Sequence, residues 1–200
     1  MKIIKYGSQE LKKIYNRSLC RKPRTISKVT KILEDVRLYG DDALCRYTRK
    51  YDKVKILPKQ LKVTQAEISG AYQNIQPDFV ESLKIIIDNI SRFYKKQVRK
   101  PWKLKNTEGV VLGEQFTPID SAGIYVPAGQ APLVSTVYMT VVPARIAGVK
   151  RIALASPPDK SGNINPHILV VADLLKVNEI YKVGGAQAIA AFTFGTKTIP

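Results

Sequence analysis

The stretch EIYKVGGAQAIAAFTF, at positions 179–194, decides how the second half of this chain folds. It begins with a short strand-like run, Glu179–Val183, and passes through two glycines into a helix expected over residues 186–194. Adjacent glycines allow a tight strand-to-helix turn and a close approach of a ligand to the backbone. The helix start offers free N–H groups and a positive dipole end, which suit a phosphate. The same turn also joins strand to helix where nothing binds, so both interpretations stay open.

The same alternation runs back along the chain from this stretch. A strand is expected over 123–126, a Pro/Gly loop over 127–132, a helix over 135–147, a strand over 151–155 and a helix over 166–175. Strands that alternate with helices form a parallel sheet with right-handed crossovers. We therefore predict an α/β fold with an incomplete Rossmann-like parallel sheet and flanking helices.

The first half of the chain is expected to be mainly helical. Apolar residues at helical spacing predict helices over 25–39, from Asp41 or Asp42 onward, from Thr64 onward and from Pro77 onward, with short strands at 54–57 and 110–112. Gly40 is expected to end the first helix, and Thr64 with Glu67 has the pattern of a capping box. The composition changes near residues 105–120. We therefore expect a basic, mainly helical region over 1–108 and an incomplete nucleotide-binding α/β domain over 109–200.

The charge is strongly basic and unevenly distributed. The net charge is +17, and residues 1–110 carry 26 Lys/Arg against 11 Asp/Glu, whereas residues 111–200 carry 7 against 5. This asymmetry indicates either an anionic partner or a solvated lysine-rich surface. The segment 94–103 comes nearest to a nucleic-acid-binding pattern, but the lysines are scattered and no Arg-rich stripe with stacking aromatics is present. We therefore favour the solvated surface and do not expect nucleic acid to bind.

Several kinds of catalytic or metal site are disfavoured by the sequence. Cys20 and Cys45 lack the spacing of a zinc clip and are expected to be reduced thiols. His167, the single histidine, opens a helix and is expected to have a surface or capping role. The acidic pairs at 34–35 and 41–42 are expected on helix surfaces or caps, exposed to solvent. No Ser/His/Asp set is visible, so no catalytic residue is assigned.

No membrane segment is expected. The N-terminus lacks the apolar stretch of a signal peptide, and the charge-free window 121–144 is interrupted by prolines and glycines. Buried α/β core explains this window better than a spanning helix. We expect a cytoplasmic protein.

Tyr125 and Gln187 are the candidate ligand-binding residues. Tyr125 ends a predicted strand beside the Pro/Gly loop, and Gln187 lies in the first turn after Gly184 and Gly185. Ligands of parallel α/β sheets bind beyond the carboxyl ends of the strands, so both side chains would share one rim. Taken alone, each residue also fits a packing role.

An ordered series of motifs closely resembles the histidinol dehydrogenase family. The matching segments are Gly123–Gly129, Ser135–Met139, Pro143–Val149, Ser156–Pro158, Val183–Ala191 and Phe194–Thr196, with a weaker likeness at 40–44 and 51–52. Two positions depart from the family pattern. Ala128 stands where a second glycine is usual, and Tyr94 stands where a histidine commonly follows Phe93.

The resemblance implies NAD-dependent, zinc-requiring oxidation of L-histidinol through histidinal to L-histidine, by a homodimer. Tyr125 and Gln187 match positions that contact NAD in the family. The resemblance places the zinc ligands, the acid–base pair and the substrate contacts beyond residue 200. The sequence is therefore expected to be the N-terminal portion of such an enzyme, inactive alone. The alternatives are a non-catalytic binding module, whose basic surface takes nucleic acid or another anion, and an unrelated nucleotide-binding α/β protein.

Overall fold

The computed structural model describes residues 3–15, 23–128 and 132–200. Its first part is helical, as expected: α1 (Gln9–Tyr15), α2 (Pro23–Tyr51), the 3-10 helix η1 (Pro58–Gln60), α3 (Gln65–Tyr72) and α4 (Pro77–Lys95). The two helices predicted around residue 40 are the two arms of α2, which kinks at Gly40 with φ +50°. The capping box of α3 is confirmed, because Glu67 N donates to Thr64 Oγ1 and Thr64 N donates to Glu67 Oε2.

The second part is the predicted alternation of strands and helices. It comprises β3 (Ser121–Tyr125), α5 (Val134–Ile146), β4 (Arg151–Ser156), α6 (Pro166–Leu174), β5 (Glu179–Lys182) and α7 (Gly185–Phe194). The three strands are parallel and lie in the order β3-β4-β5. Gly129 of the Pro/Gly loop, and Cys20, lie outside the described residues. The predicted α/β class, with a parallel sheet and flanking helices, is confirmed.

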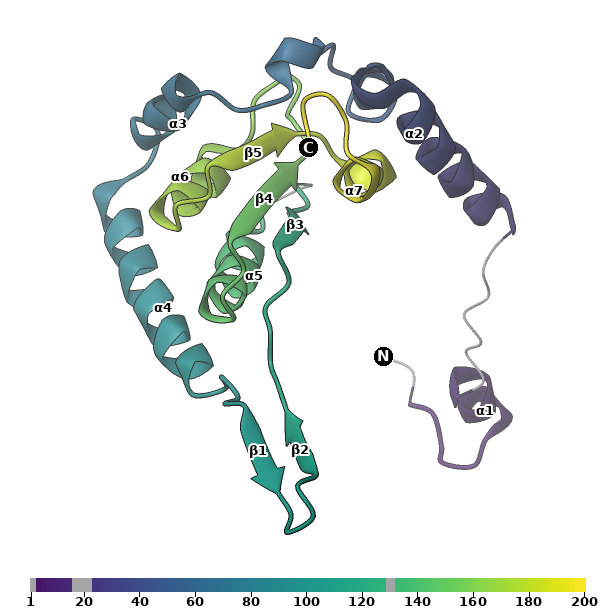
Figure 1. The fold of residues 1–200 in the computed structure, drawn as a ribbon. Helices are drawn as coiled ribbons and strands as arrows, with labels where there is room; N and C mark the ends of the chain where they lie inside the picture. The colour runs from purple at the N-terminus through teal and green to yellow at the C-terminus, as the bar shows by residue number, and fades with distance from the viewer. Residues whose placement is uncertain (1–2, 16–22, 129–131) are drawn as a thin grey trace.

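Helices from the first part cover both faces of this sheet. On one face α3 packs on α6 and α4 packs on α5, while on the other α2 packs on α7. Figure 1 shows the resulting layers, with α3 and α4 outermost on one side and α2 outermost on the other. Each of the two hydrophobic clusters draws residues from both sides of residue 108. The division of the chain at that residue stays a prediction.

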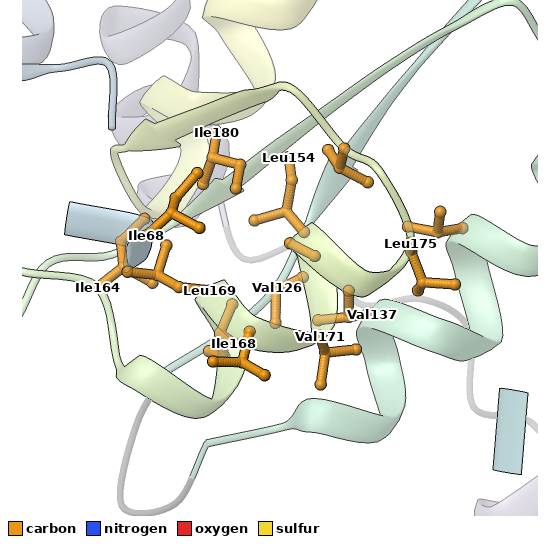
Figure 2. Close-up of a cluster of buried hydrophobic side chains, with 14 of the residues drawn as sticks. Ile68, Val126, Val137, Leu154, Ile164, Ile168, Leu169, Val171, Leu175 and Ile180 are labelled. Atoms are coloured by element: carbon orange, nitrogen blue, oxygen red, sulfur yellow. The ribbon is translucent and has the colours of Figure 1, made fainter. Parts of the chain in front are cut away.

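The larger cluster lies between the sheet and α5, α6, α3 and α4. Its strand residues alternate along each strand: Ile124, Leu154 and Ile180 point into it, and all three are at most 8% exposed. Figure 2 shows Leu154 and Ile180 above side chains of α6, including Ile168 and Val171. Because strand side chains alternate between the two faces, Tyr125 and Tyr181 point into the opposite cluster, beside α7 and α2.

A segment from the helical part borders the sheet beside β5. Val63 N donates to Ile180 O at 2.8 Å and Lys182 N donates to Leu61 O at 2.7 Å, around an antiparallel bridge between Lys62 and Tyr181. Leu61 is fully buried. The segment 61–63 therefore occupies the backbone groups of β5 that would otherwise form an open edge.

A two-stranded hairpin extends away from these layers, at the bottom of Figure 1. It consists of β1 (Trp102–Lys105) and the predicted strand β2 (Val111–Glu114), which pair antiparallel. Every residue of both strands is exposed. β1 was not predicted from the sequence: Trp102 and Leu104 do alternate with two lysines, but a run of four residues is too short for this alternation to establish a strand.

Two expectations for the first part are wrong. Residues 54–57 form no strand: Val54 and Ile56 are buried against the α2–α7 cluster, but their backbone pairs with no strand in the described chain. The acidic pairs are not all solvated either. Asp41 is 9% exposed and accepts from the Thr198 hydroxyl at 2.6 Å, and Asp35 accepts from the Tyr47 hydroxyl at 2.6 Å.

Two carboxylates make the fold sensitive to acid. Hydrogen bonds from Arg151 at 2.6 and 2.8 Å hold the pKa of Glu179 below its ordinary 4.5, against the effect of burial. Burial raises the pKa of Glu67, but hydrogen bonds from Lys182 and Thr64 outweigh it and leave that pKa lowered as well. A group whose pKa is lower in the folded state stabilises the fold above its unfolded pKa, and this contribution is lost as pH falls through the folded pKa.

We therefore expect the free energy of unfolding in urea to fall between about pH 6 and about pH 3. The double variant Glu67→Gln, Glu179→Gln should be less stable than the parent at the higher pH and should lose less stability on acidification. The variant Glu81→Gln, at an exposed position on α4, is the control. A double variant that follows the same pH curve as the parent would assign the acid loss to other groups.

Candidate functional site

The carboxyl ends of the parallel strands bring the predicted site residues into one neighbourhood. Tyr125 ends β3, and its hydroxyl accepts a hydrogen bond from Gly185 N at 3.3 Å. Gly185 is the first residue of α7 and has φ +64°, a conformation that favours glycine. The hydroxyl thus joins the end of β3 to the start of the helix that carries Gln187.

The amide of Gln187 lies directly against this turn. A Cβ at Gly185 would lie 2.9 Å from Gln187 Oε1, so the absence of a side chain at Gly185 makes room for the amide. Gln187 is 1% exposed, and neither Oε1 nor Nε2 has a hydrogen-bond partner among the described residues. A buried amide without partners is costly, because its lost hydration is not replaced. A ligand that supplies both a donor and an acceptor here would remove that cost.

The turns after β4 and β5 are in close contact. A Cβ at Gly184 would lie 2.6 Å from the Cβ of Pro157, so only glycine fits without a shift of one turn. Ser156, the last residue of β4, is fully buried, and its hydroxyl has no hydrogen-bond partner in the described structure. It faces the α5–α6 side of the sheet, opposite Tyr125. Sequence reasoning missed Ser156, although a polar residue ending an otherwise apolar strand is a signal of this edge.

The start of α7 lies beside the carboxyl end of β5, and one of its N–H groups, Gly185 N, already donates to Tyr125. Its N-cap is Gly184, and no side chain caps the first turn. The N–H groups of the first turn have no partner within the helix, and they lie at the positive end of its dipole. Together with the neighbouring Gln187 amide, they provide donors and one acceptor on a single turn, which matches the phosphate and amide groups of a dinucleotide.

Lys182 and Glu67 form a second feature at this edge that the sequence did not reveal. Lys182 ends β5, is 6% exposed, and donates a hydrogen bond from Nζ to Glu67 Oε1. Glu67 opens α3, so the ion pair fastens α3 to the carboxyl end of the sheet. The signal in the sequence is a lysine that follows two uncharged residues at the end of β5. Its partner, Glu67, lies 115 residues away.

His167 and Cys45, the other residues considered as candidates, lie in places that fit a structural role. His167 is half-buried, packs edge-on against Phe79 with ring centroids 4.9 Å apart, and its backbone N donates to Asn165, so it lies in a capped first turn. Cys45 is a free thiol, and burial, with the charges of Asp41 and Asp42, raises its pKa to about 11. At neutral pH that thiol stays protonated and is a poor nucleophile.

Within the described ranges, no three His, Cys, Asp or Glu side chains form a group that could hold a metal ion. Likewise, none of the described helices is both long and apolar enough to cross a membrane.

Comparison with known proteins identifies the family. The sequence model of the family described as histidinol dehydrogenase matches residues 16–200. The chain is 44% identical over 171 residues to the histidinol dehydrogenase of Gloeobacter violaceus, covering 86% of this chain and 38% of that protein. It is 42% identical over 203 residues to the histidinol dehydrogenase of Clostridium acetobutylicum, covering the whole chain and 47% of that protein. The chain thus spans less than half the length of these relatives.

The fold agrees with this match. The crystal structure of histidinol dehydrogenase from Elizabethkingia anophelis superposes with a TM-score of 0.83 at 41% identity, covering 87% of this chain and 40% of that one. The sequence match and the structural match thus indicate the same family, and each covers most of the chain. The chain belongs to the histidinol dehydrogenase family.

Proposed function

We propose that this chain carries part of the NAD site of a histidinol dehydrogenase, with Tyr125 and Gln187 as cofactor-binding residues. The observation that carries the proposal is the buried Gln187 amide, which has no partner in the described structure and lies against the Gly184–Gly185 turn. Family membership supports the same assignment: the match to the family covers both residues, and the motif resemblance implies that they stand at positions that contact NAD.

The chain's own residues would bind and orient the dinucleotide. The first turn of α7, which has no side-chain cap, would hold a phosphate, and the Gln187 amide would hydrogen-bond a polar group of the cofactor. Tyr125 would act through its bond to Gly185 N, which fixes the turn on which Gln187 is carried. NAD, when bound, supplies the hydride acceptor for oxidation of an alcohol. Because the amide is buried, its contact with a ligand requires a local opening of the turns that cover it.

The complete activity is proposed from the family. We propose L-histidinol as substrate, oxidation to L-histidine as the reaction, zinc as a second cofactor, a homodimer as the assembly and the cytoplasm as the location. No described cluster of side chains provides a metal site, so no part of a zinc centre is assigned to these residues. The contribution proposed for this chain is cofactor binding.

We expect Gln187→Ala to weaken binding of NAD to the 200-residue chain by about tenfold, equivalent to about 1.4 kcal/mol. Tyr125→Phe should weaken it about threefold, because it removes the hydroxyl that accepts from Gly185 N and holds the turn that carries Gln187. Isothermal titration calorimetry measures both values. The matched controls are Gln73→Ala, at an exposed position, and Tyr138→Phe on α5.

Two different results would contradict the proposal. If NAD at millimolar concentration did not bind to the parent chain, the proposal that this chain carries part of an NAD site would be wrong. If NAD bound to the parent chain and to Gln187→Ala equally well, the chain would have an NAD site of which Gln187 is not a part. The stability of Gln187→Ala should change little, since removing a buried amide without hydrogen-bond partners offsets the cost of the cavity left by the smaller side chain.

A further inference from the structure

A cleft of about 500 Å³ opens between α3 and the segment that joins β4 to α6. Its inner wall is apolar and includes Val63, Ala71 and Leu169, which are at most 7% exposed. Figure 2 shows Leu169 beside Ile68 and Ile164, at the α3 side of the hydrophobic cluster. A volume of several hundred Å³ with apolar walls and a few polar groups is typical of small-molecule sites.

A buried cation lies on one wall of this cleft. Lys182 is 6% exposed, and in the described structure its ammonium group has one hydrogen-bond acceptor, Glu67 Oε1. An ammonium group has three N–H donors, so its bonding capacity is only partly used. Glu67 is already occupied by Lys182 and by the Thr64 backbone and hydroxyl. Lys182 therefore has donors left for an acceptor that enters the cleft.

A carboxylate lies at the rim of the same cleft. Asp159 Oδ1 accepts from Ser161 N at 2.8 Å and from Asn163 N at 3.0 Å, which fixes the side chain in its loop. Its Oδ2 has no partner among the described residues, and Asp159 is exposed. The cleft thus offers a held carboxylate at its opening and a buried ammonium on its wall.

The charges select the class of ligand. A simple anion that approached Lys182 would be repelled by Glu67 and Asp159. A simple cation that approached Asp159 would be repelled by Lys182. A zwitterion with both charges on one end group can satisfy both partners, and its side chain can lie on the apolar wall. We propose that this cleft binds a free α-amino acid with an apolar side chain, its carboxylate on Lys182 and its ammonium on Asp159. The inference does not depend on the proposed NAD site.

L-leucine is the probe. Two analogues, one without the amine and one without the carboxylate, test the contacts proposed for Asp159 and Lys182. Isothermal titration of the 200-residue chain should show saturable binding of L-leucine. It should show binding at least about tenfold weaker for 4-methylpentanoate, which lacks the amine, and for 3-methylbutylamine, which lacks the carboxylate, because each loses one charge-assisted hydrogen bond. Glycine should also bind more weakly, since it leaves the apolar wall uncovered.

Substitutions locate the site. Lys182→Met and Asp159→Asn should each weaken L-leucine binding about tenfold or more. Lys160→Met, which changes an exposed lysine of the same loop outside the cleft, should leave it unchanged. Asp159→Asn keeps an oxygen for the two backbone N–H groups and should fold. It therefore tests the proposal even if Lys182→Met, which removes the cation partner of Glu67, fails to fold. The proposal is overturned if L-leucine does not bind, if either analogue binds as well as L-leucine, or if Asp159→Asn has no effect.

Discussion

Leu154→Ala is expected to lower the free energy of unfolding by about 2–5 kcal/mol. Leu154 is the fully buried residue at the middle of β4, where it pairs with Ile124 on one side and Ile180 on the other. The substitution removes apolar contacts and leaves a cavity that strands on both sides cannot close without breaking their register. A loss of this size is a large fraction of the roughly 5–15 kcal/mol that stabilises a typical domain.

Urea unfolding monitored by circular dichroism measures the change. Leu38→Ala, where the side chain is 73% exposed on α2, is the matched control and should change stability by less than about 0.5 kcal/mol. If the two variants lost the same stability, the sheet interior would not be the centre of the fold.

Gly123→Ala is expected to destabilise the protein by about 1–3 kcal/mol, although the substitution adds a single methyl group. A Cβ at Gly123 would lie 2.6 Å from two ring atoms of Phe192 and 3.0 Å from its Cβ. Phe192 belongs to α7, so the helix must move away from β3 or the ring must leave its position. Because α7 also carries Gln187, we expect the same substitution to weaken NAD binding.

A double-mutant cycle separates this clash from other effects. Phe192→Ala removes the ring, so Gly123→Ala should cost much less in that background, and the two free-energy changes should not add. Gly70→Ala in α3 is the control: nothing lies within 4 Å of the added Cβ, and the helix should gain up to about 1 kcal/mol. Additive changes at residues 123 and 192 would show that the ring is not what excludes a side chain.

The regular α/β part was predictable because its signals are local. Glycines and prolines mark the ends of its elements, and apolar runs fill its strands, so β3, β4, β5 and the three helices lie within one or two residues of the predicted bounds. The break at Gly40 was predictable for the same reason: the glycine was expected to end a helix, and it adopts a positive φ at the kink of α2. Tyr125 and Gln187 could be placed at one edge from topology alone.

The features that were missed depend on distant partners. The bridge between Lys62 and Tyr181, and the hydrogen bonds of Asp41 with Thr198, leave no local pattern in the sequence. The segment 54–57, wrongly predicted as a strand, has the alternation of a strand, and its apolar residues are buried in the cluster around α2 and α7. Its backbone, however, pairs with no strand in the described chain. The lack of hydrogen-bond partners for the buried polar atoms of Ser156 and Gln187 likewise depends on all the surrounding residues, so the sequence cannot show it.

The packing of α2 on α7 also has a consequence for synthesis of the chain. Asp41 and its partner Thr198 are separated by 157 residues, so the ribosome releases α2 long before it makes α7. At translation rates of about 5–20 residues per second, this delay is roughly 8–31 seconds. During that time the buried face of α2, including Val36 and Leu44, lacks the α7 residues of its cluster. We therefore expect α2 to stay exposed to solvent or to a chaperone until α7 has been made and can pack on it.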